Sequence, residues 1–201
     1  MAGVARSVRH AVHAARRRGR LNRAEHLQAR FFLALRPDAR AAAELARLAA
    51  RLAAALGGRP LSAHDVHLTL VFVGARPVDE ATSLRSLLDG IAPHWPGLPL
   101  TRLGSFGRGL WWVGPADTPA WPVLLADQLR QRLREAGIGF DERALHLHAT
   151  LLRGARPHAK AAFPASADDL PIVAEHWSLA LGWSGANSTP QRRYRWIEAP
   201  G

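Results

Sequence analysis

Cysteine is absent from this chain of 201 residues, and lysine and tyrosine occur once each. The lack of cysteine excludes a disulfide framework, a zinc or iron–sulfur site with Cys ligands, and a thiol nucleophile. A chain without disulfides suits the reducing cytosol, so we expect a cytoplasmic protein. No run of about 18 apolar residues is present, so we expect no membrane-spanning helix. The apolar fraction of 48% and the charged fraction of 21% are typical of a globular chain, with one domain or at most two small ones.

Acidic residues are scarce relative to basic ones, with 16 Asp and Glu against 27 Lys and Arg and a net charge of +11. Residues 1–29 contain seven arginines and one acid, Glu25, and carry +6, which leaves +5 for the remaining 172 residues. A cationic surface attracts nucleic acids. Lys160 is the only lysine, however, and a coding bias toward arginine produces the same composition. The charge by itself therefore leaves both interpretations open.

Residues 1–29 are rich in arginine and alanine and lack the apolar segment that a secretory signal peptide needs. The stretch 11–15 is interrupted by His13 and followed by three arginines. The composition also fits a mitochondrial targeting peptide, although nothing else in the chain supports one. We predict a basic, disordered extension over 1–29 and one folded domain over 30–201.

The hydrophobic pattern of the remaining chain predicts seven strands and three helices. Asp38 stands where the N-cap of the first helix belongs, and Gly57 follows the last apolar position of that helix. Hairpin-like neighbours interrupt the alternation of strands and helices, which favours the α+β class over a doubly wound parallel sheet. The predicted strands are 31–35, 66–73, 99–106, 110–113, 145–152, 173–183 and 193–197, and the predicted helices are 41–56, 80–91 and 123–136.

Two of the predicted strands carry nearly the same four residues, His-Leu-Thr-Leu at 67–70 and His-Ala-Thr-Leu at 148–151. Side chains alternate between the two faces of a strand, so the histidine and the threonine of each motif share one face. One such motif is common by chance, but two copies 81 residues apart indicate two similar halves that face each other. The polar positions are His67, Thr69, His148 and Thr150, and the apolar ones are Leu68, Leu70, Ala149 and Leu151.

Two imidazoles and two hydroxyls around one cleft have a definite chemical use. A neutral imidazole can take a proton from water while an imidazolium gives one to a leaving oxygen. Threonine hydroxyls can donate hydrogen bonds to the non-bridging oxygens of a phosphate. This set suits hydrolysis of a strained phosphodiester without a metal ion, above all a ribose 2′,3′-cyclic phosphate. The spacing does not say which histidine carries the proton.

His146 raises a metal site as an alternative, because His-x-His can bind a metal ion. No further Asp or His cluster accompanies it at a metallohydrolase spacing, so we expect no metal. Trp111 and Trp112 point to opposite faces of their strand, so one can pack in the core while the other lines the cleft.

The two motifs belong to a longer set of recognisable segments: 30–37, 58–74, 103–113, 139–143, 148–153, Ser184 and Tyr194. With them the chain resembles the 2H phosphoesterase superfamily and, within it, the bacterial RNA 2′,3′-cyclic phosphodiesterase family, also called the 2′-5′ RNA ligase family. The resemblance covers residues 30 to about 197. Leu147 stands where that family usually has proline, and residues 1–29 have no counterpart there.

The resemblance implies a bilobal α+β fold in which two pseudo-symmetric antiparallel sheets, with flanking helices, surround a central cleft. It implies hydrolysis of 2′,3′-cyclic phosphate ends of RNA or oligonucleotides to 2′-phosphomonoesters, with no cofactor. His67 would be the proton donor and His148 the proton acceptor, while Thr69 and Thr150 would hold the phosphate. Arg153, at the end of the second motif, would bind the phosphate as well.

Alternatives remain at this point. Arg108, at the tip of a predicted hairpin, is a second candidate for substrate binding, but a solvated arginine explains it equally well. The same fold would also suit a reversible 2′-5′ RNA ligase or a 2′-5′ phosphodiesterase. A non-catalytic RNA-binding module is a further candidate, although binding alone does not need paired imidazoles. We expect RNA ends as the partner and a monomer, since no extra apolar stripe is present.

Overall fold

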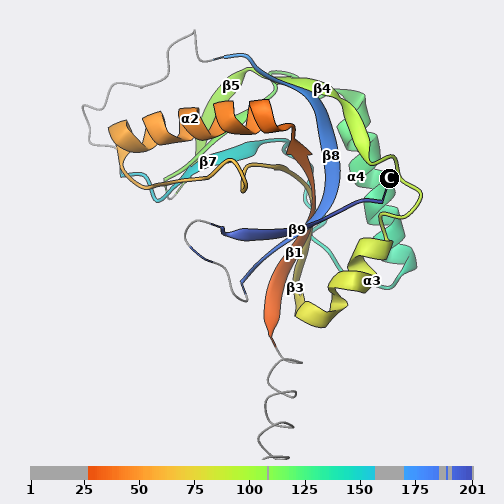
Figure 1. The fold of residues 1–201 in the computed structure, drawn as a ribbon. Coiled ribbons are helices and arrows are strands. Elements are labelled where there is room, and N and C mark those ends of the chain that lie inside the picture. The colour runs from red at the N-terminus through yellow and green to blue at the C-terminus, as the bar shows by residue number, and fades with distance from the viewer. Residues whose placement is uncertain (1–26, 108, 157–169, 186–188, 190–191, 201) are drawn as a thin grey trace, which may run out of the picture.

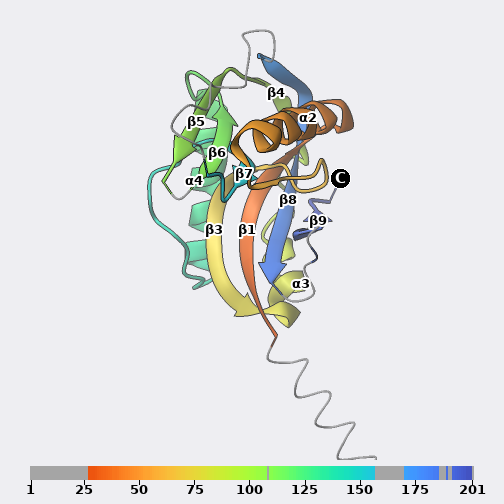
Figure 2. The ribbon, with the colours of Figure 1, turned by 90° about the vertical axis from the view of Figure 1, so that its left-hand side faces the viewer.

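The computed structural model describes residues 27–107, 109–156, 170–185, 189 and 192–200. Within them the chain forms one antiparallel sheet of nine strands with three α-helices (Figures 1 and 2). The strands are β1 (Gln28–Pro37), β2 (Arg59–Pro60), β3 (Leu68–Pro77), β4 (His94–Leu100), β5 (Arg102–Phe106), β6 (Leu110–Gly114), β7 (Ala149–Arg153), β8 (Ile172–Gly185) and β9 (Tyr194–Glu198). The helices are α2 (Ala39–Leu56), the 3₁₀ turn η1 (Val78–Glu80), α3 (Ala81–Ser86) and α4 (Ala120–Glu135).

The sheet order is β4-β8-β1-β3-β7-β6-β5, with β2 paired to β7 and β9 paired to β8. This arrangement confirms the α+β class. The two sheets of the expected bilobal fold are hydrogen-bonded into one, because β3 and β7 pair at Leu68 and Ala149. Each half keeps its own strands on its own side of this junction, β4, β8, β1 and β3 on one and β7, β6 and β5 on the other.

β1 lies in the middle of the first half, between β3 and β8. Its segment Phe31–Leu35 is at most 2% exposed, as expected for an uninterrupted apolar run covered on both faces. The strand begins at Gln28, and Ala29 is buried, so the last residues of the predicted extension 1–29 belong to the domain. Residues 1–26 lie outside the described part of the chain.

α2 packs against β1, β7 and β8, whereas α4 packs on β3 in another part of the molecule (Figure 1). The Oδ1 atom of Asp38 accepts a hydrogen bond from the Ala41 amide at 2.9 Å, which confirms the predicted N-cap. The helix ends before Gly57, whose φ of 66° suits glycine. The face of α2 that points to the sheet contains Leu45, Leu48, Leu52 and Leu56.

Three predicted elements differ from the structure. The predicted strand 145–152 begins only at Ala149, as β7, so His148 lies just before the strand. The predicted strand 99–106 is two strands, because the chain leaves β8 after β4 and pairs with β6 from β5 onward. The predicted helix 80–91 ends with α3 at Ser86, and hydrogen bonds of turn type continue the chain to Ile91. No helix in the described residues is long and apolar enough to cross a membrane.

Candidate active site

The two repeated motifs meet at the junction between the halves of the sheet. Leu68 of β3 pairs directly with Ala149 of β7 in antiparallel register. An approximate two-fold axis therefore passes between these two residues, and the polar side chains that flank them project to one face. One cavity of about 270 Å³ is lined by side chains from both motifs and the strand end that follows: His67, Thr69, His148, Thr150 and Arg153.

His67 lies just before β3 and is only 7% exposed. Its Nδ1 atom lies 2.6 Å from the backbone oxygen of Asp65. A carbonyl oxygen only accepts, so Nδ1 carries the hydrogen and Nε2 is the atom left for proton transfer. The imidazole stacks on Phe32 at 4.9 Å between ring centroids, and the rings of Tyr194 and Trp196 approach it edge-on.

His148 repeats this arrangement on the second half. Its Nδ1 atom lies 2.6 Å from the backbone oxygen of His146, so Nε2 is again the atom available for chemistry. The ring is half-buried and meets Phe106 edge-on at 5.0 Å between centroids. Trp112, 7% exposed, packs against the rings of His146 and His148. The two candidate catalytic imidazoles thus have the same tautomer, and each is held by the backbone oxygen two residues before it and by packing against aromatic rings.

Burial controls the charge of both imidazoles. The pKa of His67 is lowered from 6.5 to about 4, chiefly by burial and also by the nearby Arg153 guanidinium, while the hydrogen bond to Asp65 opposes the shift. Burial also lowers the pKa of His148, assisted by His146 and Arg153. His67 is therefore neutral at pH 7 in the free protein.

This shift predicts a pH-dependent stability. The unfolded chain binds a proton at His67 near pH 6.5, whereas the folded protein binds it only near pH 4. The contribution of His67 is therefore fully present above pH 6.5 and is lost as the pH falls toward 4. Between pH 7 and pH 4.5 we expect the free energy of unfolding to fall by about 2–3 kcal/mol more in the native protein than in His67→Gln, measured by urea denaturation. An equal fall in both proteins would contradict the assignment.

Arg153 and Tyr194 join the motifs to the last strand. The Nη2 atom of Arg153 donates to the Tyr194 hydroxyl at 3.3 Å, while its buried Nε has no hydrogen-bond partner among the described residues. Asp65, 2% exposed, accepts hydrogen bonds from the Arg193 amide at 3.0 Å and the Tyr194 amide at 3.1 Å. One buried carboxylate therefore holds the start of β9 against the segment that carries His67.

Four residues of this surrounding shell were not identified from the sequence as part of the site: Phe32, Asp65, Tyr194 and Trp196. The first and the last two belong to strands distant in sequence from the motifs, so no local pattern links them to His67. Asp65 stands two residues before His67. Its position just ahead of an apolar strand was the one feature of the sequence that could have indicated a role near the site.

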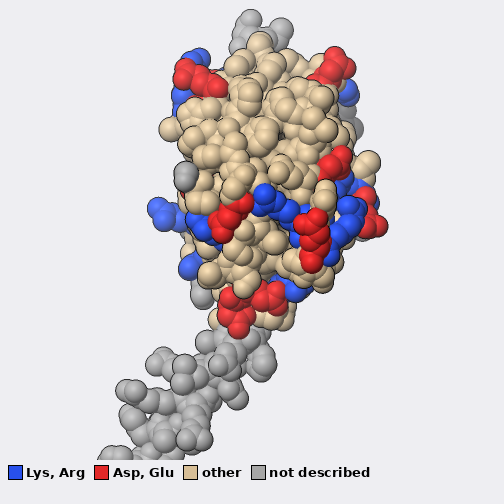
Figure 3. Space-filling view, turned by 90° about the vertical axis from the view of Figure 1, so that its right-hand side faces the viewer, with Lys and Arg blue, Asp and Glu red and all other residues tan. Residues whose placement is uncertain are grey.

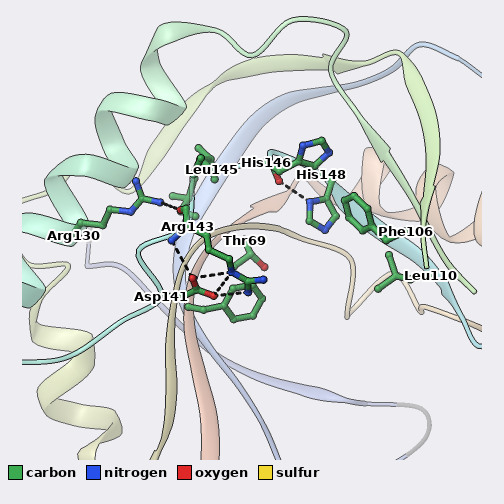
Figure 4. Close-up of a pocket in the computed structure, with 12 residues that line it drawn as sticks. Thr69, Phe106, Leu110, Arg130, Asp141, Arg143, Leu145, His146 and His148 are labelled. Atoms are coloured by element: carbon green, nitrogen blue, oxygen red, sulfur yellow. Dashed lines mark hydrogen bonds and ion pairs between the residues drawn. The ribbon is translucent and has the colours of Figure 1, made fainter. Parts of the chain in front are cut away.

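A wider cavity of about 450 Å³ opens beside the first and shares Thr69 and His148 with it (Figure 4). Phe72 and Phe106 line it and are 48% and 39% exposed. Next to Phe72, whose backbone oxygen accepts a hydrogen bond from the Asp141 amide at 2.8 Å, the Asp141 carboxylate accepts hydrogen bonds from the Arg143 guanidinium, which holds the pKa of Asp141 at about 2. This wall combines apolar rings with a fixed ion pair.

Two other candidates from the sequence have different outcomes. Arg108 lies outside the described residues. The His146 ring centroid lies 5.5 Å from that of His148, at the edge of the wider cavity. Among the residues that the structure describes, no group of three His, Asp or Glu side chains could hold a metal ion.

The chain is similar in sequence and in fold to known phosphoesterases. A family model described as LigT like Phosphoesterase matches residues 35–112. The RNA 2′,3′-cyclic phosphodiesterase of Escherichia coli (strain K12) is 34% identical over 128 residues, which are 62% of this chain and 66%, just under two thirds, of that protein. A crystal structure of E. coli LigT complexed with 3′-AMP superposes with a TM-score of 0.65 at 26% identity and covers 86% of this chain and 96% of its own. A crystal structure of TT0787 of Thermus thermophilus shares the fold at a TM-score of 0.58 and 20% identity, over 85% of this chain and 95% of its own.

Proposed function

Because this chain belongs to the family of LigT-like phosphoesterases, we propose that it hydrolyses 2′,3′-cyclic phosphate ends of RNA or oligonucleotides to 2′-phosphomonoesters. The observation that carries the proposal is a cavity lined by both histidines and both threonines of the motifs, with each Nδ1 atom held by a backbone carbonyl. This arrangement leaves two Nε2 atoms free for one proton transfer each.

In the proposed reaction a water molecule attacks phosphorus, and the bond from phosphorus to O3′ breaks. The Nε2 atom of His148 takes the proton from the water, and the Nε2 atom of His67 gives a proton to O3′. Thr69, Thr150 and Arg153 donate hydrogen bonds to the non-bridging oxygens, where negative charge grows in the transition state. Protons balance, because the base gains the one that the acid loses.

His67 must become protonated when the substrate binds, because only the imidazolium can act as the proton donor. Its pKa of about 4 leaves the ring neutral at pH 7 in the free protein. A bound phosphodiester places a negative charge beside the ring, and an adjacent opposite charge favours the imidazolium. The reverse order, with His148 as the donor, is the second candidate, because His148 is the more exposed ring and burial opposes its protonation less.

The wider cavity would hold the nucleoside. Its exposed Phe72 and Phe106 rings offer apolar faces of the kind on which bases stack. Because the cavity shares Thr69 and His148 with the phosphate cavity, a nucleoside there would stay close to the reacting phosphorus.

We also propose that the protein acts in the cytoplasm as a monomer. The lack of cysteine supports the first point. For the second, the exposed large apolar side chains among the described residues are spread over several elements rather than forming one continuous face. They are Leu27, Phe72, Phe106, Val123, Leu124 and Val173.

The test is hydrolysis of a nucleoside 2′,3′-cyclic phosphate in the presence of EDTA, with the product isomers separated by chromatography. We expect the nucleoside 2′-phosphate as the product and no loss of rate with EDTA. A 3′-phosphate product would mean that O2′ is the leaving group and would overturn the proposed geometry. Tight binding without turnover would favour the RNA-binding module, and loss of activity in EDTA would favour a metal enzyme.

A further inference from the structure

A third cavity, of about 690 Å³, adjoins the candidate active site at the C-terminal end of α2. Three arginines line it, Arg59, Arg153 and Arg156, together with the glycines of the turn after α2. Arg153 also lines the cavity that contains the two histidines, so the two cavities share a guanidinium. No acidic residue is among the described residues that line either of them.

The backbone holds these arginines in place. Arg59 of β2 is the direct antiparallel partner of Arg153 of β7, and such partners share one face of the sheet. The Arg156 amide donates to the Leu56 carbonyl at 2.9 Å, which fastens this residue to the end of α2. A Cβ atom at Gly58 would lie 2.8 Å from the Arg153 carbonyl oxygen, so only glycine allows the turn to approach β7 this closely.

The charged side chains that line this cavity, among the described residues, are all basic. Figure 3 shows one face of the molecule, on which acidic and basic side chains lie next to one another. Ion pairs between residues four positions apart, such as Arg85 with Asp89 and Arg40 with Glu44, are further examples of neighbouring opposite charges. In the part of the chain that the structure describes, neither Arg59 nor Arg156 has an ion pair, and both are exposed. Exposed guanidinium groups without an acidic neighbour attract phosphate.

We infer that this cavity binds a backbone phosphate of the RNA strand that precedes the cyclic phosphate, so that the preferred substrate is an oligonucleotide rather than a mononucleotide. The inference rests on the proposed function. With the reacting phosphate at Arg153, a strand that turns toward β2 brings its next phosphate to Arg59 and Arg156. Successive phosphates of the RNA strand would then contact arginines only, because no acidic residue is among the described residues that line the two cavities.

The test compares two substrates with the same terminal nucleotide, a nucleoside 2′,3′-cyclic phosphate and a pentanucleotide that ends in it. The variant is Arg59→Gln/Arg156→Gln. The matched control is Arg47→Gln/Arg102→Gln, which removes two exposed charges outside the cavity. For the cavity variant we expect kcat/KM on the pentanucleotide to fall about tenfold or more, with little change on the mononucleotide. Loss of the contacts to this one phosphate should also lower the salt slope for the pentanucleotide by about 0.7.

Several outcomes would overturn the inference: equal loss on both substrates, no loss on either, or the same loss in the control. Arg30 lines the cavity of the histidines and also a further cavity beside Ala75 and Ser184. A loss on the pentanucleotide in Arg30→Gln, with none in Arg59→Gln/Arg156→Gln, would show that the strand leaves through that further cavity. Binding of a pentanucleotide with a terminal 2′-phosphate, followed by fluorescence anisotropy, gives the same comparison without turnover. Failure of the proposed function, seen as no hydrolysis of either substrate, is thus separate from failure of the phosphate site.

Discussion

Replacing His148 with alanine is expected to lower kcat for a nucleoside 2′,3′-cyclic phosphate by a factor of about 10²–10⁴. The substitution removes the Nε2 atom that takes the proton from the attacking water, and no other described side chain on the β7 side of the cavity can replace it. The fold should persist, since His148 is half-buried and, among the described residues, its side chain is hydrogen-bonded only to the backbone oxygen of His146. Steady-state kinetics, with circular dichroism to check folding, measure the effect.

A substrate with an activated leaving group separates the roles of the two histidines. His67→Ala should be as impaired as His148→Ala on the cyclic phosphate. On a nucleoside 2′-(para-nitrophenyl) phosphate, the leaving nitrophenolate needs no proton, so His67→Ala should approach the native rate while His148→Ala stays slow. The opposite pattern would exchange the two roles.

His94→Ala is the matched control for both variants, because His94 lies exposed on β4, outside the cavities of the site. It should leave both activities at the native level. Native turnover in His67→Ala and in His148→Ala, on both substrates, would remove the proposed acid–base mechanism altogether.

Replacing Asp65 with alanine is expected to lower the free energy of unfolding by about 1–3 kcal/mol, because it leaves one buried and one part-buried backbone amide without acceptors. These are the amides of Arg193 and Tyr194, which now bind the Asp65 carboxylate at 3.0 and 3.1 Å. The start of β9 would loosen, and with it the Tyr194 hydroxyl that holds Arg153. Equilibrium denaturation in urea measures the loss.

Two further variants make this prediction specific. Asp65→Asn keeps one oxygen acceptor in the same place, so it should lose less stability than the alanine variant. Asp117→Ala removes an exposed carboxylate and should change the free energy of unfolding by no more than about 0.5 kcal/mol. If Asp65→Ala were as stable as Asp117→Ala, the carboxylate would not be what holds β9 in place.

Local sequence patterns were reliable where the physical cause is local. The uninterrupted apolar run at 31–35 is a strand buried on both faces, and Asp38 caps α2 as its position before an apolar helical pattern indicated. The prediction failed at 99–106, where the sequence continues as a strand while the chain changes partners from β8 to β6. Pairing depends on strands elsewhere in the chain, and the residues of 99–106 carry no sign of the exchange.

By itself the sequence determined that each motif places a histidine two residues before a threonine, the spacing that puts both side chains on one face of an extended chain, although each histidine lies just before its strand. The tertiary structure decided that these faces meet, through the pairing of Leu68 with Ala149 across 81 residues. It also decided how His67 is surrounded, since Phe32 and Tyr194 contact it from strands that lie near opposite ends of the sequence. Burial by those rings lowers the pKa of His67 to about 4, so the charge state of the candidate active site follows from contacts that no local pattern encodes.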